Sequence, residues 1–121
     1  MDSPRVALIR RLFEHMEKDD LARATEELLD NSVEDVVFAP HAAHGKEMRG
    51  HDELRRFWSE FEDEGMQLRA GAYSIAEDGD MVVVNGWVRT IDEGRLADTQ
   101  SRWVYRFNDQ DQVVSARVER A

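Results

Sequence analysis

The order of helical and strand-like apolar patterns constrains the fold of this chain more than any other feature. Apolar residues recur at helical spacing to about residue 30 and again from residue 50 to 61. A short apolar stretch over residues 33–38 and a loop over 41–49 lie between them, and strand-like alternation follows from about residue 66 to the end. This order predicts an α+β domain, a cone-shaped, curved antiparallel sheet packed against three N-terminal helices. A cone of that shape encloses a pocket.

Length, charge and composition narrow the class of protein. The 121 residues suit one domain over 1–121, and the absence of cysteine excludes disulfides, thiolate metal sites and cysteine nucleophiles. The formal net charge of −10 argues against nucleic acid and anionic membranes as partners. No apolar run approaches the ~20 residues of a membrane span. Ser3-Pro4 leads directly into an amphipathic helix rather than a signal peptide, so we expect a cytoplasmic protein.

Three helices are predicted, each with one apolar face. Ser3 is a suitable N-cap and Pro4 suits the first helical position of the first helix. The second helix is expected over residues 21–29, and the third begins at Gly50-His51. Their inward faces are expected to carry Val6, Ile9, Leu12, Phe13 and Met16; Leu21, Ala24, Thr25 and Leu28; and Leu54, Phe57, Trp58 and Phe61. These side chains can form a pocket wall or ordinary core.

Alternation assigns the two faces of the later strands. Arginines mark the outer face, so the inward set over residues 81–107 reads Val82, Val84, Val88 and Thr90, then Thr99, Ser101, Trp103, Tyr105 and Phe107. In the last strand Val114, Ala116 and Val118 are expected inward, opposite Val113, Ser115 and Arg117. Val36 and Phe38 are expected inward in the first strand, and the strand over 66–75 has no clear phase.

The order of these elements resembles the nuclear transport factor 2-like superfamily, in its polyketide cyclase-like and ketosteroid isomerase-like branches. The residues that carry the resemblance are Asp19-Asp20-Leu21, Val36-Val37-Phe38-Ala39-Pro40, Gly50 with Leu54 and Phe57-Trp58, and Trp103, Tyr105 and Phe107-Asn108 followed by Val113-Val114. The resemblance implies a curved sheet wrapped around three helices, with a pocket in the open end of the cone. The superfamily hosts enzymes as well as non-catalytic binders, so the fold leaves the activity open.

The catalytic residues of known relatives do not carry over to this chain. The resemblance places the tyrosine and two aspartates of the steroid isomerases on Leu12, Ala39 and Trp103, none of which abstracts a proton or donates a hydrogen bond to an enolate. The chain contains no Arg-x-Asp, the motif of the related epoxide hydrolases. Steroid isomerisation and epoxide hydrolysis by those mechanisms are therefore not expected.

His41 and Tyr105 are the candidate catalytic residues. His41 follows the first strand and could transfer protons at the pocket rim, while the Tyr105 hydroxyl could orient a ligand carbonyl. The alternatives are a solvated loop for His41 and His44 and a backbone partner for Tyr105. His-x-x-His could also suggest a metal, but no second ligand cluster exists, so no metal and no cofactor are predicted.

The remaining candidates are ligand-binding side chains on inward faces. They are Phe13, Met16, Phe38, Phe57, Trp58, Phe61, Val84, Val88, Thr90, Ser101, Trp103 and Val118. Their apolar character predicts a small-molecule-binding domain for a hydrophobic ligand, with a cyclase- or isomerase-type activity left open. The alternative is a non-catalytic dimerisation or interaction module of the same fold.

Trp87 predicts how the chain associates. It is expected on the outer sheet face among Asn85, Arg89, Arg102, Val104, Arg106 and Arg117. A tryptophan on a solvent-facing sheet is an expected interface anchor, which favours a homodimer through this face, and the resemblance implies the same pairing. In a monomer the arginine stems would instead cover the indole.

Overall fold

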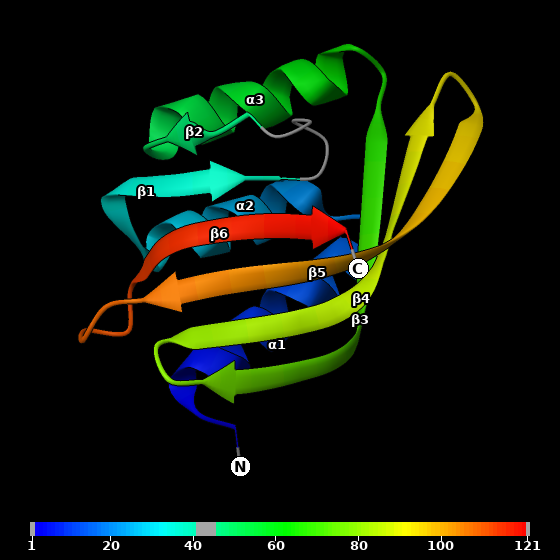
Figure 1. The fold of residues 1–121 in the computed structure, drawn as a ribbon. Coiled ribbons are helices and arrows are strands. Elements are labelled where there is room, and N and C mark those ends of the chain that lie inside the picture. The colour runs from blue at the N-terminus through cyan, green and yellow to red at the C-terminus, as the bar shows by residue number, and fades with distance from the viewer. Residues whose placement is uncertain (1, 41–45, 121) are drawn as a thin grey trace.

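The computed structural model describes residues 2–40 and 46–120, which form three helices and six strands (Figure 1). In chain order they are α1 (Pro4–Glu17), α2 (Leu21–Asp30), β1 (Ser32–Ala39), β2 (Met48–Arg49), α3 (His51–Asp63), β3 (Gln67–Asp78), β4 (Met81–Asp92), β5 (Arg95–Phe107) and β6 (Val113–Arg120). The α+β class and the curved, open sheet are confirmed. In the described part of the chain, no helix is both long and apolar enough to cross a membrane.

Local sequence explains where the helices begin. The Ser3 hydroxyl accepts a hydrogen bond from the Val6 amide at the start of α1, and the Asp20 carboxylate accepts one from the Arg23 amide at the start of α2. Gly50 precedes α3 with φ of 86°, a backbone conformation that glycine adopts without strain. Figure 1 shows α1 and α2 against one face of the sheet and α3 across its open end, beside β1 and β2.

The strands form one sheet in the order β2-β1-β6-β5-β4-β3. Every pairing is antiparallel except that of β1 with β6, which is parallel, so the sheet is mixed rather than wholly antiparallel as predicted. β6 follows the hairpin-connected strands β3, β4 and β5 and returns beside β1. Glu93 and Gly94, with φ of 52° and 80°, make the two-residue turn between β4 and β5.

The face assignment of β4 and β5 is confirmed. Val82, Val84 and Val88 are buried, as are Ser101, Trp103, Tyr105 and Phe107 on the neighbouring strand. Arg89, Arg102 and Arg106 are exposed and pair with Asp98, Glu119 and Asp80 on the outer face. The core therefore lies between this inner face and the three helices.

One face assignment is wrong. Val113 is fully buried and pairs with Phe107, whereas Val114 is only half-buried. The register of β5 and β6 shifts between Arg106 and Phe107, and the extra residue reverses the phase of the strand start. Ala116 and Val118 keep the inward phase that alternation predicted, opposite Tyr105 and Trp103.

The long strands bend around two glycines. The register of β3 and β4 shifts between Ala72 and Ser74, and two glycines lie just before this bulge, Gly71 in β3 and Gly86 opposite Ala72 in β4. A Cβ atom on Gly86 would overlap the carbonyl oxygen of Gly71, while one on Gly71 would meet the Trp87 indole at 2.5 Å. Close approach of the two backbones at Gly86 is what lets the sheet turn over the helices, as Figure 1 shows for β3, β4 and β5.

Candidate functional site

A small apolar cavity lies between the helices and the inner sheet face. Its volume is about 50 Å³. It is lined by Leu12, Met16, Leu21, Ala24, Thr25, Leu28, Phe38, Pro40, Trp58, Leu68, Ala70, Val88, Trp103, Tyr105 and Val118. Binding sites for small molecules usually occupy roughly 300–1,000 Å³, so a ligand would have to displace some of these side chains.

Seven of the predicted site residues meet at this cavity. They are Met16, Phe38, Trp58, Val88, Trp103, Tyr105 and Val118. Six others lie outside its lining. Phe13 packs edge-on against Trp103 with ring centroids 4.8 Å apart, and Phe57 packs against Trp58. Phe61 lines a neighbouring cleft, Val84 and Ser101 are buried in the core, and Thr90 is half-buried. His41 lies outside the described residues.

Sequence reasoning missed some of the lining residues. Leu68 and Ala70 come from β3, whose phase the sequence did not reveal, and Pro40 follows β1. Leu12, Leu21, Ala24, Thr25 and Leu28 were predicted to face inward, and they line the cavity as well as filling the core. Alternation identified the inner face but could not distinguish residues beside an internal gap from residues packed solidly around it.

Tyr105 is the polar group that best fits a ligand. It is 3% exposed and lines the cavity. Burial raises the pKa of the phenol above its ordinary value, so the hydroxyl is a neutral donor at physiological pH. The Thr25 hydroxyl, by contrast, already donates to the Leu21 carbonyl at 2.8 Å.

Ser101 carries a second hydroxyl on the same strand face. Its side chain is fully buried, and its Oγ has no hydrogen-bond partner within the part of the chain that the structure describes. It pairs with Gly86 and precedes the cavity-lining Trp103 by two residues, so it lies beside the cavity wall rather than on it. A buried hydroxyl without a hydrogen-bond partner is energetically unfavourable. This end of the inner face therefore contains a polar group whose hydrogen-bonding capacity is unused.

The cavity lining contains no carboxylate and no imidazole among the described residues. His15 instead contacts Glu27 at 3.1 Å between α1 and α2, Asp98 is held by Arg89 on the outer face, and Asp35 is exposed. Within the described part of the chain, no group of three or more metal-ligating side chains is placed to hold an ion. The described site can bind and orient a molecule, but it supplies no general base.

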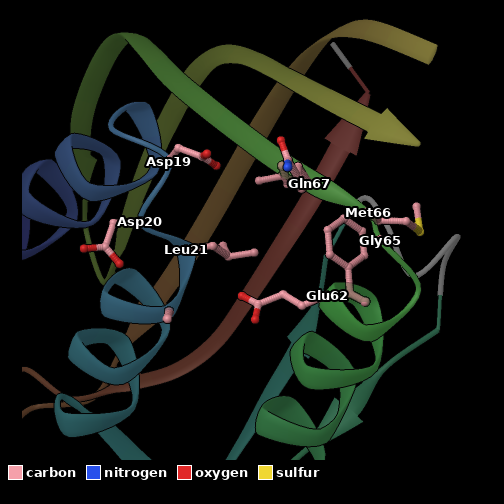
Figure 2. Close-up of a pocket in the computed structure, with 10 residues that line it drawn as sticks. Asp19, Asp20, Leu21, Glu62, Gly65, Met66 and Gln67 are labelled. Carbon is pink, nitrogen blue, oxygen red and sulfur yellow. The ribbon is translucent and has the colours of Figure 1, made fainter. Parts of the chain in front are cut away.

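Two surface clefts adjoin the cavity. The larger, of about 320 Å³, shares Leu21 and Leu68 with it and lies between the α1–α2 turn, the end of α3 and the start of β3 (Figure 2). The other, of about 280 Å³, lies between α2 and α3 and shares Thr25 and Trp58 with the cavity. The cavity therefore shares two lining side chains with each of these clefts.

The chain is similar to known proteins in sequence pattern and in fold. A family model described as the SnoaL-like domain matches residues 9–116. No curated protein matches the sequence at a significant level. An NTF2-like protein of unknown function from Burkholderia pseudomallei is similar in structure, with a TM-score of 0.81, 22% identity, and coverage of 99% of this chain and 92% of that one.

Two further structures have the same fold. TerC, co-crystallized with polyporic acid, has a TM-score of 0.78 at 20% identity, covering 98% of this chain and 92% of that one. A protein named as a SnoaL-like polyketide cyclase from Jannaschia sp. has a TM-score of 0.74 at 17% identity, covering 98% of this chain and 89% of that one. At such identities these likenesses establish a common fold and nothing about the ligand.

Proposed function

Because this chain belongs to the SnoaL-like domain family, we propose that it binds one small, mostly apolar organic molecule in the cavity beside Tyr105. The observation that carries the proposal is the buried side chain of Tyr105, a polar group set in an otherwise mostly apolar cavity lining. Such a group favours a ligand with one carbonyl or hydroxyl oxygen on an otherwise apolar body. The co-crystallization of TerC with polyporic acid supports an organic ligand for this fold.

A cyclase- or isomerase-type reaction is the activity that this family membership favours. Tyr105 would donate a hydrogen bond to a carbonyl oxygen as negative charge develops on it. The described cavity residues offer no base, so His41, which lies outside the described residues, is the proposed proton-transferring group on sequence grounds alone. No cofactor or metal is part of the proposal.

The expected result of Tyr105→Phe is weaker binding of a carbonyl ligand without weaker binding of a hydrocarbon. 4-Phenylbutan-2-one and butylbenzene have the same apolar body, and only the ketone accepts a hydrogen bond. Losing that bond should weaken ketone binding roughly three- to tenfold. The measurement is a titration followed by the NMR signals of the tryptophan indole N–H groups. Tyr73→Phe is the matched control, because Tyr73 is 66% exposed.

The same titration tests the alternative of a non-catalytic interaction module. The cavity volume of about 50 Å³, with Phe38, Trp58 and Trp103 in its wall, is the observation that favours this alternative. If neither compound shifts the indole signals at millimolar concentration, the cavity is closed core and the binding proposal fails. If both bind and Tyr105→Phe affects them equally, the hydroxyl does not orient the ligand.

We also propose that the chain forms a homodimer through its outer sheet face. Two large apolar side chains are well exposed there, Tyr73 at 66% and Leu96 at 62%, and Trp87 is half-buried. A groove of about 360 Å³ crosses this face beside Trp87. The paired charges of Arg89 with Asp98 and Arg102 with Glu119 suit a self-complementary contact.

Sedimentation should detect a dimer at micromolar concentration, and Trp87→Glu should shift it to monomer. The substitution places a charge where the contact would exclude water. Gln110→Glu makes the same change of charge in the β5–β6 turn and should leave the dimer intact. Far-UV circular dichroism verifies that both variants are folded. A wild-type monomer at this concentration would contradict the proposal.

A further inference from the structure

Three serine and threonine side chains are buried in the described part of the chain, and they differ in their hydrogen bonds. The Thr25 hydroxyl donates to the Leu21 carbonyl. The Ser32 hydroxyl donates to the Leu28 carbonyl, again four residues earlier in α2. Ser101 is 0% exposed, and its Oγ has no partner among the described residues. It lies inside β5, whose backbone is paired with β4 on one side and β6 on the other, so it has no free helix carbonyl nearby to accept its proton.

The position of Ser101 on the inner sheet face brings it next to the cavity lining. Across the sheet it pairs with Gly86, which has no side chain. Its inner-face neighbours include Trp103, two residues along β5, and Val88, two residues beyond Gly86 in β4, because side chains on a strand alternate between faces. Val118, which pairs with Trp103, is a diagonal neighbour in β6. Trp103, Val88 and Val118 all line the cavity, so three of its wall residues adjoin the unpartnered hydroxyl.

The cavity must expand before it can admit a small molecule. Its volume is about 50 Å³, so a ligand has to displace lining side chains. Displacement of Trp103, Val88 or Val118 would bring the Ser101 Oγ to the cavity surface. The unpartnered hydroxyl destabilises the protein without ligand, and a ligand oxygen that bonds to it would remove this cost.

We propose that Ser101 is a second ligand-binding residue, and that the ligand carries an oxygen at each end of an apolar body, one for Tyr105 and one for Ser101. This inference rests on the proposed binding function and adds a second oxygen to the ligand. The two residues lie four positions apart on the same face of β5, which separates their Cα atoms by roughly 13 Å. That separation suits two oxygens on one ligand better than a single oxygen shared by both hydroxyls.

The experiment compares two ketones, 4-(4-hydroxyphenyl)butan-2-one and 4-(4-methylphenyl)butan-2-one. Both contain a carbonyl oxygen for Tyr105, and they differ only in the hydroxyl or methyl group at the far end of the ring, which are close in size. Binding is followed by the tryptophan indole N–H signals. Ser101→Ala should weaken binding of the hydroxyphenyl ketone roughly three- to tenfold and leave binding of the methylphenyl ketone unchanged. Tyr105→Phe should weaken both, because both contain the carbonyl.

Ser32→Ala is the matched control, since it makes the same substitution at a buried hydroxyl that has a partner. It should lower the urea midpoint of the protein without ligand and leave the ratio of the two affinities as in the wild type. Ser101→Ala should keep or raise the midpoint, because it removes a buried polar group that no described residue satisfies. Stability and binding are therefore expected to change in opposite ways in these two variants.

The outcomes separate this inference from the function on which it rests. If Ser101→Ala lowers the midpoint as much as Ser32→Ala does, the hydroxyl already has a partner in the free protein, such as an internal water, and the inference is wrong. If Ser101→Ala leaves the ratio of the two affinities unchanged while both ketones bind, the cavity binds ligands without using Ser101, and the inference is also wrong. If neither ketone shifts the indole signals, the binding function itself fails.

Discussion

Gly86→Ala is expected to lower the free energy of unfolding by about 3 kcal/mol, at the upper end of the range for overpacking. The added Cβ would overlap the carbonyl oxygen and carbon of Gly71 and crowd the Ala72 Cα, all of them backbone atoms. No side-chain rotation relieves such an overlap, so β3 must move away from β4 at the bulge. Urea denaturation at one fixed protein concentration measures the change, since a dimer would make stability depend on concentration.

Gly71→Ala is the matched control. Its Cβ would meet only the Trp87 ring, at 2.5 Å, and a half-buried side chain can move aside. We expect a loss of about 1 kcal/mol, which should largely vanish when Gly71→Ala is made in a Trp87→Ala background. Equal losses for Gly86→Ala and Gly71→Ala would show that the two backbones do not approach closely at Gly86.

Trp103→Ala is expected to cost about 3–5 kcal/mol of unfolding free energy. The indole is 6% exposed, packs edge-on against Phe13 at 4.8 Å and forms part of the cavity wall. Removing it enlarges an existing gap instead of letting neighbours collapse into the space, because β5 is held by β4 and β6 on both sides. Thermal and urea unfolding of the variant provide the measurement.

Trp87→Ala tests whether the stability lost in Trp103→Ala reflects the position of the indole in the core or only its size. Trp87 lies on the outer face and is only half-buried, so its truncation should cost clearly less than that of Trp103. Added indole should recover part of the stability of Trp103→Ala by filling the enlarged cavity, and should not affect Trp87→Ala. A Trp103→Ala protein as stable as the wild type would contradict the assignment of the inner face.

The strand faces could be predicted where a strand is regular and its outer face is charged. Arg102 and Arg106 alternate with Trp103 and Tyr105, and this pattern alone placed the aromatic side chains in the core. The prediction was wrong at Val113 because one inserted residue reverses the phase of a strand. Only the partner strand reveals such a bulge, since the register is a property of the pair.

The candidate site was less predictable than the fold. Asp19 and Glu62 lie more than forty positions apart in the sequence, and only the packing of α3 over the start of α2 brings them to one cleft. The cavity volume depends on how the rings of Phe38, Trp58 and Trp103 settle against one another, which residue type and spacing do not specify. The inner-face hydroxyls of Ser101 and Tyr105 were identified by alternation, but the lack of a hydrogen-bond partner for the Ser101 Oγ among the described residues could only be seen in three dimensions.

The place of β6 in the sheet has a consequence for synthesis on the ribosome. β6 lies between β1 and β5, as Figure 1 shows for the red strand between the cyan and orange ones. The first strand to be translated therefore has no neighbour other than the two-residue β2 until residues 113–120 have left the exit tunnel. During that interval the edge of β1 that pairs with β6 in the folded protein has no hydrogen-bonding partner. The sheet of this chain is thus completed late, and β1 is the strand that waits longest for a partner.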